Sequence, residues 1–144
     1  MTAKQYLQSY KKYERLYIAA VEQIKSIDNE MISLKSPNFE ERVQSSPVKD
    51  PIGEMVCALE KEKGKLSLKM VKYKTTMALI KSQIDKINEE NNDYYVILLF
   101  RYVLFKDWQC ICDKLHLSRS QANVIHGMAL VEFDDKFAKF YAEK

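Results

Sequence analysis

Glycine and proline are scarce in this sequence, with only three of each among 144 residues. Sandwiches and barrels of β-strands need frequent turns, and these two residue types build most turns, so their scarcity argues against such folds and favours long helices. Apolar residues still make up 47% of the chain, which is enough for a hydrophobic core. The sequence therefore predicts an all-α protein.

Cysteine and long apolar runs are also sparse. The three cysteines are an odd number and form no disulfide framework, which is typical of proteins in the reducing cytoplasm. No stretch approaches the roughly 20 consecutive apolar residues that a membrane-spanning helix needs. The polar start MTAKQYLQSYKKY is not that of a signal peptide. We expect a cytoplasmic protein without a membrane partner.

The signature motifs of common enzymes and nucleotide-binding folds are missing. The chain contains no GxxxxGK[S/T], no GxGxxG and no HExxH. Its two histidines, His116 and His126, are scattered, so no catalytic pair of a nucleophile and a histidine base can be proposed. We therefore expect neither catalytic activity nor a cofactor.

Two long segments repeat apolar residues at alternating steps of four and three, the 3.5-residue period of a left-handed coiled coil. The first set of seam positions is Tyr6, Tyr10, Tyr13, Tyr17, Ala20, Ile24, Ile27, Met31 and Leu34. The second set is Ile52, Val56, Leu59, Lys63, Leu66, Met70, Tyr73, Met77, Ile80, Ile84 and Ile87. Lys63 is the one polar member, and a polar residue at such a position can fix the register of a coiled coil.

A loop of about residues 35–51, KSPNFEERVQSSPVKDP, is predicted between the two segments from its serines and prolines. Asp50 is a predicted N-cap, with Pro51 at the first helical position, where the missing N–H of proline is no loss. Residues 1–90 are therefore predicted to form a long antiparallel helical hairpin. Such a hairpin is marginal alone, so we expect hairpins to pair and form a homo-oligomer.

Residues 91–144 are predicted to form a second helical unit. The run NEENND, residues 88–93, contains poor helix formers and predicts a kink or break. The run YYVILLFRYVLF after it is densely apolar and predicts a buried helix. Asp107 is then a predicted N-cap for a helix with a short apolar face. The residues of that face are Trp108, Ile111, Cys112 and Leu115.

A tight turn and a further helix are predicted directly after this face. His116 falls where such turns often have glycine, and histidine tolerates positive φ better than most residues. Ser118 and Gln121 have the spacing of a capping box, and Leu117 with Ala122 that of a hydrophobic staple. The expected buried face of the further helix is Ala122, Ile125, Ala129 and Phe133. Residues 107–131 thus predict a helix-turn-helix, whose second helix lies in the DNA major groove.

Cys110, Cys112 and His116 present the alternative of a metal site in the same stretch. Zinc needs several ligands that converge at about 2.0–2.3 Å. Residues two apart on a helix lie about 200° apart around its axis, so the two cysteines diverge. The spacing CxC followed by one histidine also matches no common structural site. We therefore predict that no metal is bound.

The stretch ICDKLHLSRSQANVIHGMAL resembles the last helical unit of sigma-70 region 4. The positions that match its pattern are Ile111, Leu115, Ser118, Ala129 and Leu130. With ERVQSSPVKDP and LLFRYV, the chain from about residue 40 to 135 resembles the small phage-encoded regulators of the RinA/ArpU type. The resemblance implies a helical N-terminal part and a sigma-70 region 4-like C-terminal part. It also implies transcriptional regulation in a bacterial host cell, usually activation of late or packaging genes of a phage.

The second helix of the helix-turn-helix supplies the candidate contacts to double-stranded DNA, because arginine can bind guanine and asparagine or glutamine can bind adenine. These candidates are Arg119, Ser120, Gln121, Asn123, Val124 and His126. His126 is interpreted equally well as a packing residue. Seven basic and seven acidic residues follow position 90, so this part of the chain is neutral. That neutrality favours an alternative, a module that contacts RNA polymerase or another protein. A phage small terminase subunit is a further alternative, because it would also join a helix-turn-helix to helical oligomerisation.

Overall fold

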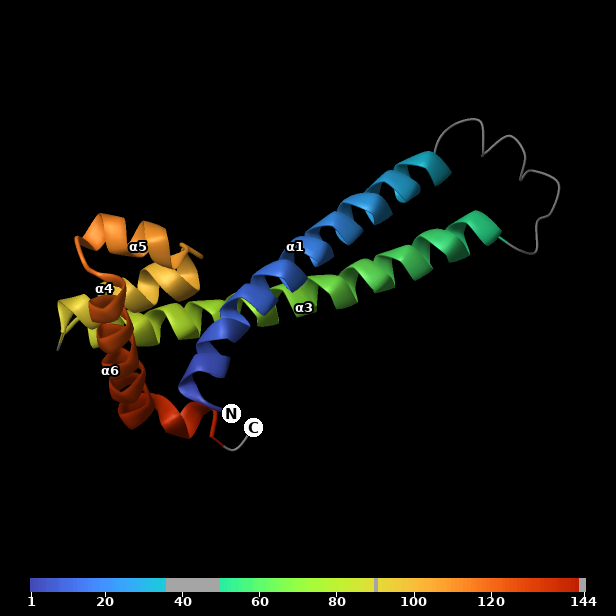
Figure 1. Cartoon of the computed structure of the whole chain (residues 1–144). Coiled ribbons are helices and arrows are strands. Elements are labelled where there is room, and N and C mark those ends of the chain that lie inside the picture. The colour runs from blue at the N-terminus through green and yellow to red at the C-terminus, as the bar shows by residue number, and fades with distance from the viewer. Residues whose placement is uncertain (36–49, 90, 143–144) are drawn as a thin grey trace. The chain divides into compact units, whose positions relative to one another are not determined.

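The computed structural model describes residues 1–35, 50–89 and 91–142, and every regular element within them is helical (Figure 1). The longest elements are α1 (Ala3–Leu34) and α3 (Pro51–Ile87). The shorter helices are α4 (Asn92–Leu98), α5 (Trp108–Leu115) and α6 (Arg119–Phe137). A π-helical turn, η1 (Leu99–Val103), follows α4, and a 3-10 turn, η2 (Ala138–Phe140), follows α6. The all-α prediction is confirmed, whereas nearly all of the predicted loop lies outside the described residues.

Contacts divide the chain into two compact units. The first comprises Met1–Glu14 with Thr75–Lys144, and the second comprises Arg15–Lys74. This division differs from the predicted boundary at residue 90, because the first turns of α1 and the end of α3 pack against the C-terminal helices. The reason is chemical: Tyr6, Ile84 and Ile87 contribute to the same hydrophobic core as α4 and α6.

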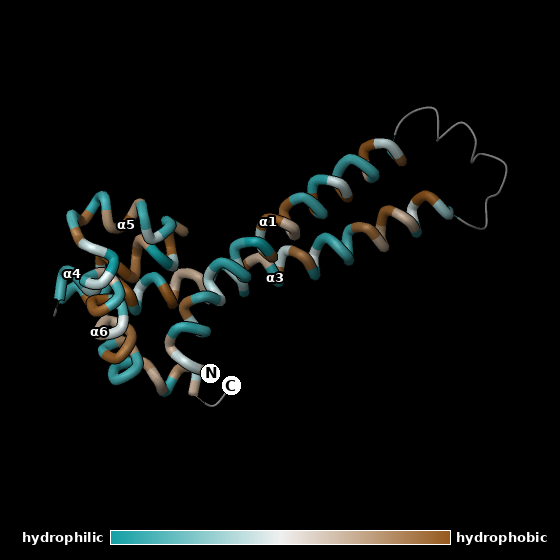
Figure 2. The backbone as a smooth tube through the Cα atoms, in the orientation of Figure 1, coloured by the Kyte–Doolittle hydropathy of each residue, from teal (hydrophilic) through white to brown (hydrophobic). Residues whose placement is uncertain are grey.

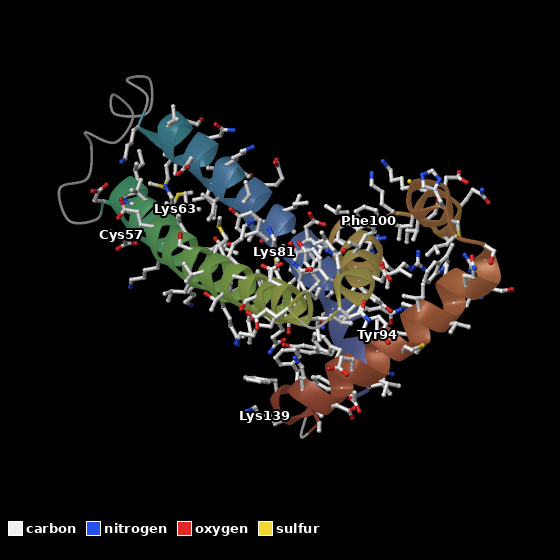
Figure 3. All side chains as sticks on the ribbon, turned by 90° about the vertical axis from the view of Figure 1, so that its left-hand side faces the viewer. Cys57, Lys63, Lys81, Tyr94, Phe100 and Lys139 are labelled. Carbon is white, nitrogen blue, oxygen red and sulfur yellow. The ribbon has the colours of Figure 1, made fainter. Side chains whose placement is uncertain are left out.

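The second unit is an antiparallel pair formed by parts of α1 and α3. Lys63 Nζ lies 2.6 Å from Asp28 Oδ1, and the Lys74 ammonium lies 4.4 Å from the centroid of the Tyr17 ring. Tyr17 precedes Asp28 by as many residues as Lys74 follows Lys63. Both contacts therefore belong to one antiparallel register. Figure 3 shows Lys63 on the side of α3 that faces α1. The polar seam position thus forms an ion pair across the hairpin.

Both predicted seams are confirmed by burial, since every predicted position is buried or half-buried. Leu66, Ala20 and Ile27 are among the buried members in the second unit, and Met77, Ile80 and Ile84 among those in the first. Figure 2 shows apolar and polar residues alternating along both long helices, as a one-sided seam requires. No helix among the described residues is both long and apolar enough to cross a membrane.

The ends of α3 follow local signals in the sequence. Asp50 Oδ1 accepts a hydrogen bond of 2.9 Å from the backbone N–H of Gly53, and Pro51 is the first helical residue, as predicted. At the other end α3 stops at Ile87. The side chain of Asn91 then caps α4 by accepting from the N–H groups of Asp93 and Tyr94. The predicted break at residues 88–93 is therefore confirmed.

The apolar run after that break is helical, but it is not one α-helix. It changes to π-helical geometry at Leu99 and leaves the helix after Val103. Phe105 then adopts a left-handed backbone conformation with φ of 55°. Ile97, Leu98 and Tyr102 are buried, which confirms the predicted core role of this run. The π-helical turn was not predicted, because hydrophobic periodicity does not distinguish it from a continuing α-helix.

Candidate nucleic-acid interface

The first helix of the candidate interface, α5, begins as its sequence predicts. Asp107 Oδ1 accepts a hydrogen bond of 2.8 Å from the backbone N–H of Cys110. This bond satisfies one of the N–H groups that a helix start leaves without a partner in the helix. On the predicted apolar face Ile111 is fully buried. Trp108, Cys112 and Leu115 are partly buried and pack against the core.

A three-residue turn joins α5 to α6. His116 has φ of 55° and ψ of 44°, the left-handed conformation expected for it, and its N–H donates to the Cys112 carbonyl. The N–H of Leu117 donates to the same carbonyl at 3.0 Å. These two bonds close the C-terminal end of α5, so that α6 can start at once in a new direction. Figure 1 shows α6 running across the direction of α5.

The start of α6 is fixed by the predicted capping box. The Gln121 N–H donates to Ser118 Oγ at 3.2 Å, and the Ser118 N–H donates to Gln121 Oε1 at 3.0 Å. The Gln121 side chain, a predicted DNA contact, therefore holds the helix start with its carbonyl oxygen. Ala122, Ala129 and Phe133 are fully buried and Ile125 is partly buried, so the predicted buried face is confirmed.

Five of the six candidate contact residues lie exposed on the first two turns of α6. These residues are Arg119, Ser120, Gln121, Asn123 and Val124. They face away from the core because Ala122 and Ile125 occupy the opposite side of the helix. The structure therefore presents arginine, serine, glutamine, asparagine and valine side chains to solvent at the end of α6 that follows the turn.

His126 lies elsewhere, in a half-buried cluster of rings. Its Nε2 is 2.7 Å from the Tyr102 hydroxyl, and its ring meets the Trp108 ring edge-on with centroids 4.9 Å apart. Burial, together with the positive charges of Lys4 and Arg101, lowers the pKa of His126 to about 4. The neutral imidazole is thus a packing residue in this structure, which was one of its two interpretations.

Trp108 brings together two arginines that are distant in sequence. The guanidinium carbons of Arg101 and Arg119 lie 5.1 Å and 4.7 Å from the centroid of its ring. Cations over an indole face are attracted by its quadrupole, so the ring holds both side chains beside the start of α6. Sequence reasoning did not place Arg101 here. Its position on the π-helical turn became apparent only from the structure.

Basic residues also reach this unit from α1. Lys4, Lys11 and Lys12 lie in Met1–Glu14, the segment of α1 that belongs to the first unit. These three lysines are not included in the neutral charge balance of residues 91–144. Lys4 is close enough to His126 to lower its pKa. Lys4 therefore adds a positive charge beside the ring cluster of the first unit, and Glu14 of the same segment adds a negative one.

Further along α6, the solvent-facing side becomes apolar. Val124, Met128 and Val131 are 61%, 51% and 63% exposed. With Tyr94 of α4, labelled in Figure 3, they line a shallow hollow of about 480 Å³. Three large exposed apolar residues one helical turn apart form a stripe that water solvates poorly.

The cysteines of this region occupy different surroundings. Cys112 packs against the hydrophobic core, whereas Cys110 is half-buried outside it. Within the residues that the structure describes, no group of three or more histidine, cysteine, aspartate or glutamate side chains is arranged to hold a metal ion. The packing of Cys112 gives it the role of a small apolar residue.

Comparison with known proteins finds no matching family model, no matching curated protein and no matching solved structure.

Proposed function

We propose that the protein is a sequence-specific DNA-binding transcriptional regulator that inserts the start of α6 into the major groove. The observation that carries this proposal is the exposed first turn of a firmly capped helix, directly after α5 and a three-residue turn. In helix-turn-helix proteins this part of the second helix contacts base edges. Capping at Ser118 supports the proposal because it fixes where the contacting side chains begin.

The exposed side chains suit the chemistry of base edges. Arg119 can donate two hydrogen bonds to guanine, and Asn123 can pair with adenine. Val124 offers an apolar surface for the methyl group of thymine. The N-terminal end of α6 also carries the positive end of the helix dipole, which favours a nearby phosphate.

Affinity would come from several copies rather than from one. A single unit with few positive charges binds DNA weakly, since phosphate contacts dominate affinity. A homo-oligomer assembled through the hairpin would hold two or more α6 helices at one site and raise the effective concentration of each. The resemblance to phage-encoded regulators of the RinA/ArpU type adds a more specific role. On that basis the protein is a phage- or prophage-encoded activator of late genes in a bacterial cytoplasm.

A second candidate function rests on the apolar stripe of Val124, Met128 and Val131. Base pairs and phosphates are polar, whereas such a stripe is typical of a surface that docks another protein. On this hypothesis α6 contacts RNA polymerase or another protein. The protein then needs no excess of positive charge.

Selection from random-sequence DNA tests the proposal. The purified protein is incubated with a random duplex library, and bound molecules are recovered, amplified and sequenced over several rounds. The expected result is one enriched motif, with symmetry or spacing that reflects the number of copies bound. A library that stays random after selection at low salt would contradict DNA reading and favour the second candidate, for which purified RNA polymerase is the first partner to test.

A further inference from the structure

A pocket of about 300 Å³ lies in the first unit, beside the ring cluster of Trp108 and His126 but separate from the exposed face of α6. Among the described residues, its lining combines the first part of α1 with the segment around the π-helical turn. The lining side chains are Gln8, Lys11, Arg101, Tyr102 and Phe105. Its volume is at the lower end of the range for small-ligand sites.

The lining combines two cationic side chains and one amide with two aromatic rings, and these five residues include no acidic side chain. In the part of the chain that the structure describes, neither Lys11 nor Arg101 forms an ion pair with a carboxylate. Lys4 adds a third positive charge nearby, because it acts on His126, the hydrogen-bond partner of Tyr102. The five lining side chains therefore carry two positive charges and no negative charge, which suits an anionic ligand.

The backbone around the pocket is held in an unusual conformation. Arg101 and Tyr102 lie on the π-helical turn, and such turns occur often at functional sites. Phe105 has φ of 55°, which is sterically unfavourable for a bulky side chain. Strain of this kind persists where surrounding structure enforces it, and it concentrates at binding sites.

A hydrogen bond and a ring contact position Arg101, and a ring contact positions Lys11. The Lys106 N–H donates to the Phe100 carbonyl at 2.9 Å, and Arg101 Nη1 donates to the Lys106 carbonyl at 3.3 Å. The Arg101 guanidinium also lies over Trp108, and the Lys11 ammonium lies 5.5 Å from the centroid of the Phe105 ring. Both cations are thus arranged by the fold before any anion binds, which lowers the entropic cost of binding.

We propose that this pocket binds a phosphate group, held by Lys11 and Arg101 with the Gln8 amide as a further donor. Guanidinium and ammonium groups are the usual partners of phosphate oxygens, since these bonds are charge-assisted. The phosphate can come from two sources: the backbone of DNA, or a free phosphate-bearing small molecule. The DNA source rests on the proposed function. It is the expected source, because Arg101 shares the Trp108 ring with Arg119 at the start of α6.

The first arm of the test measures DNA affinity as a function of salt for Lys11→Gln and for Lys12→Gln. Lys12 is the matched control: it is an exposed neighbour on α1 that is absent from the pocket lining. Loss of one phosphate contact should reduce the magnitude of the negative slope of log affinity against log salt by about 0.9 for Lys11→Gln on any sequence. Lys12→Gln should keep the parent slope. Equal changes in both variants would show an unspecific charge effect and contradict the DNA source.

The second arm titrates the protein with inorganic phosphate, with chloride at matched ionic strength as the reference, and follows the amide NMR signals of Tyr102 and Phe105. Saturating shifts that are lost in Lys11→Gln but kept in Lys12→Gln would establish a phosphate site, even for a protein that binds no DNA. If neither arm separates Lys11 from Lys12, the pocket proposal is wrong. Failure of the proposed function gives a different result, namely DNA binding without sequence preference or no DNA binding at all.

Discussion

The Tyr102 hydroxyl lies 2.7 Å from Nε2 of His126, and the two rings are stacked with centroids 5.8 Å apart. Both side chains are uncharged at neutral pH. Burial raises the pKa of Tyr102 to about 12 and lowers the pKa of His126 to about 4. A neutral hydroxyl can then donate to the unprotonated Nε2 of a neutral imidazole. This hydrogen bond joins the π-helical turn to α6, so the protonation of His126 is coupled to the packing of the candidate interface.

Acidification should therefore weaken the fold through His126. Between its ordinary pKa of 6.5 and its folded pKa of about 4, the unfolded chain binds more protons at this residue than the folded chain does. The stability that neutral His126 contributes is fully present above pH 6.5 and is lost as the pH falls toward 4. The expected loss is about 1–2 kcal/mol, less than a fully buried ring would give, because solvent screens a half-exposed one.

Urea unfolding at pH 7 and at pH 5 measures this loss in the parent and in His126→Gln. Other titrating groups contribute equally to both proteins, so the difference between their pH dependences isolates His126. The variant should lose less stability than the parent over this interval. Identical pH dependences would show that His126 has the same pKa in the folded and unfolded chain.

The Tyr6 hydroxyl donates a 2.9 Å hydrogen bond to Gln83 Oε1, and Gln83 is only 1% exposed. The Nε2 of the same amide has no hydrogen-bond partner in the described residues. Tyr6→Phe should leave the whole buried amide without a partner and lower the free energy of unfolding by about 1–3 kcal/mol. Adding Gln83→Met to Tyr6→Phe should recover much of that loss, because both polar groups are then gone. Chemical denaturation of the three proteins provides the measurement, and a double variant less stable than Tyr6→Phe would contradict this explanation.

Ser118 and its neighbour Ser120 form a matched pair for testing the helix start. Ser118→Ala removes the capping hydroxyl and should lower the free energy of unfolding by about 1 kcal/mol. Ser120 is exposed inside the first turn, where alanine has the better helix propensity, so Ser120→Ala should have no destabilising effect. Urea midpoints at one pH compare the two variants. Equal midpoints would show that the capping box contributes nothing measurable.

The hairpin should self-associate, because it exposes large apolar side chains outside its own seam. Ile32 is 70% exposed and Leu68 is 74% exposed. Light scattering should give more than one chain per particle, and Ile32→Lys with Leu68→Lys should reduce the particle mass. Lys69→Gln, a change at an exposed neighbour, is the control. A monomeric parent at micromolar concentration would contradict both the assembly and the affinity argument for DNA binding.

Helix starts and seams could be predicted from the sequence because their causes are local. Asp50, Asp107 and Ser118 cap helices through backbone groups within three residues, so spacing alone identifies them. The positions that the 3.5-residue period identified are likewise all buried or half-buried, since one face of a helix is a local property. The left-handed conformation of His116 was also predictable locally, because the residue falls where such turns often have glycine and histidine tolerates positive φ.

Relationships between distant segments could not be predicted in this way. Tertiary packing brings Tyr6 into contact with Gln83 and Tyr141 in the core. It also brings Arg101 and Arg119 together on the ring of Trp108. Neither the hydrophobic period nor a helix-capping motif indicates these contacts. For the same reason the charge of Lys4 beside His126 was absent from the predicted charge of this unit. The choice between contact and packing for His126 also needed the position of Tyr102.

Base reading by α6 depends on the side chains of its first two turns. If Arg119 makes two hydrogen bonds to a guanine, Arg119→Ala should weaken binding to the selected site by about 1–3 kcal/mol and relax preference at one base position. Arg119→Lys keeps the charge but not the two-pronged geometry, so it should lose the preference while retaining the salt dependence. Asn123→Ala should act in the same way at a neighbouring position.

Two controls complete this experiment. Lys139 lies beyond the C-terminal end of α6, as Figure 3 shows, so Lys139→Ala should leave sequence preference unchanged. Ala122 is fully buried, and Ala122→Asp should unfold the unit because it buries a charge without a partner. Circular dichroism separates loss of folding from loss of contact, which matters because Arg119 also packs on Trp108. If folded Arg119→Ala and Asn123→Ala bind the selected site as tightly as the parent, α6 does not read bases, and the apolar stripe of Val124, Met128 and Val131 becomes the surface to test for a protein partner.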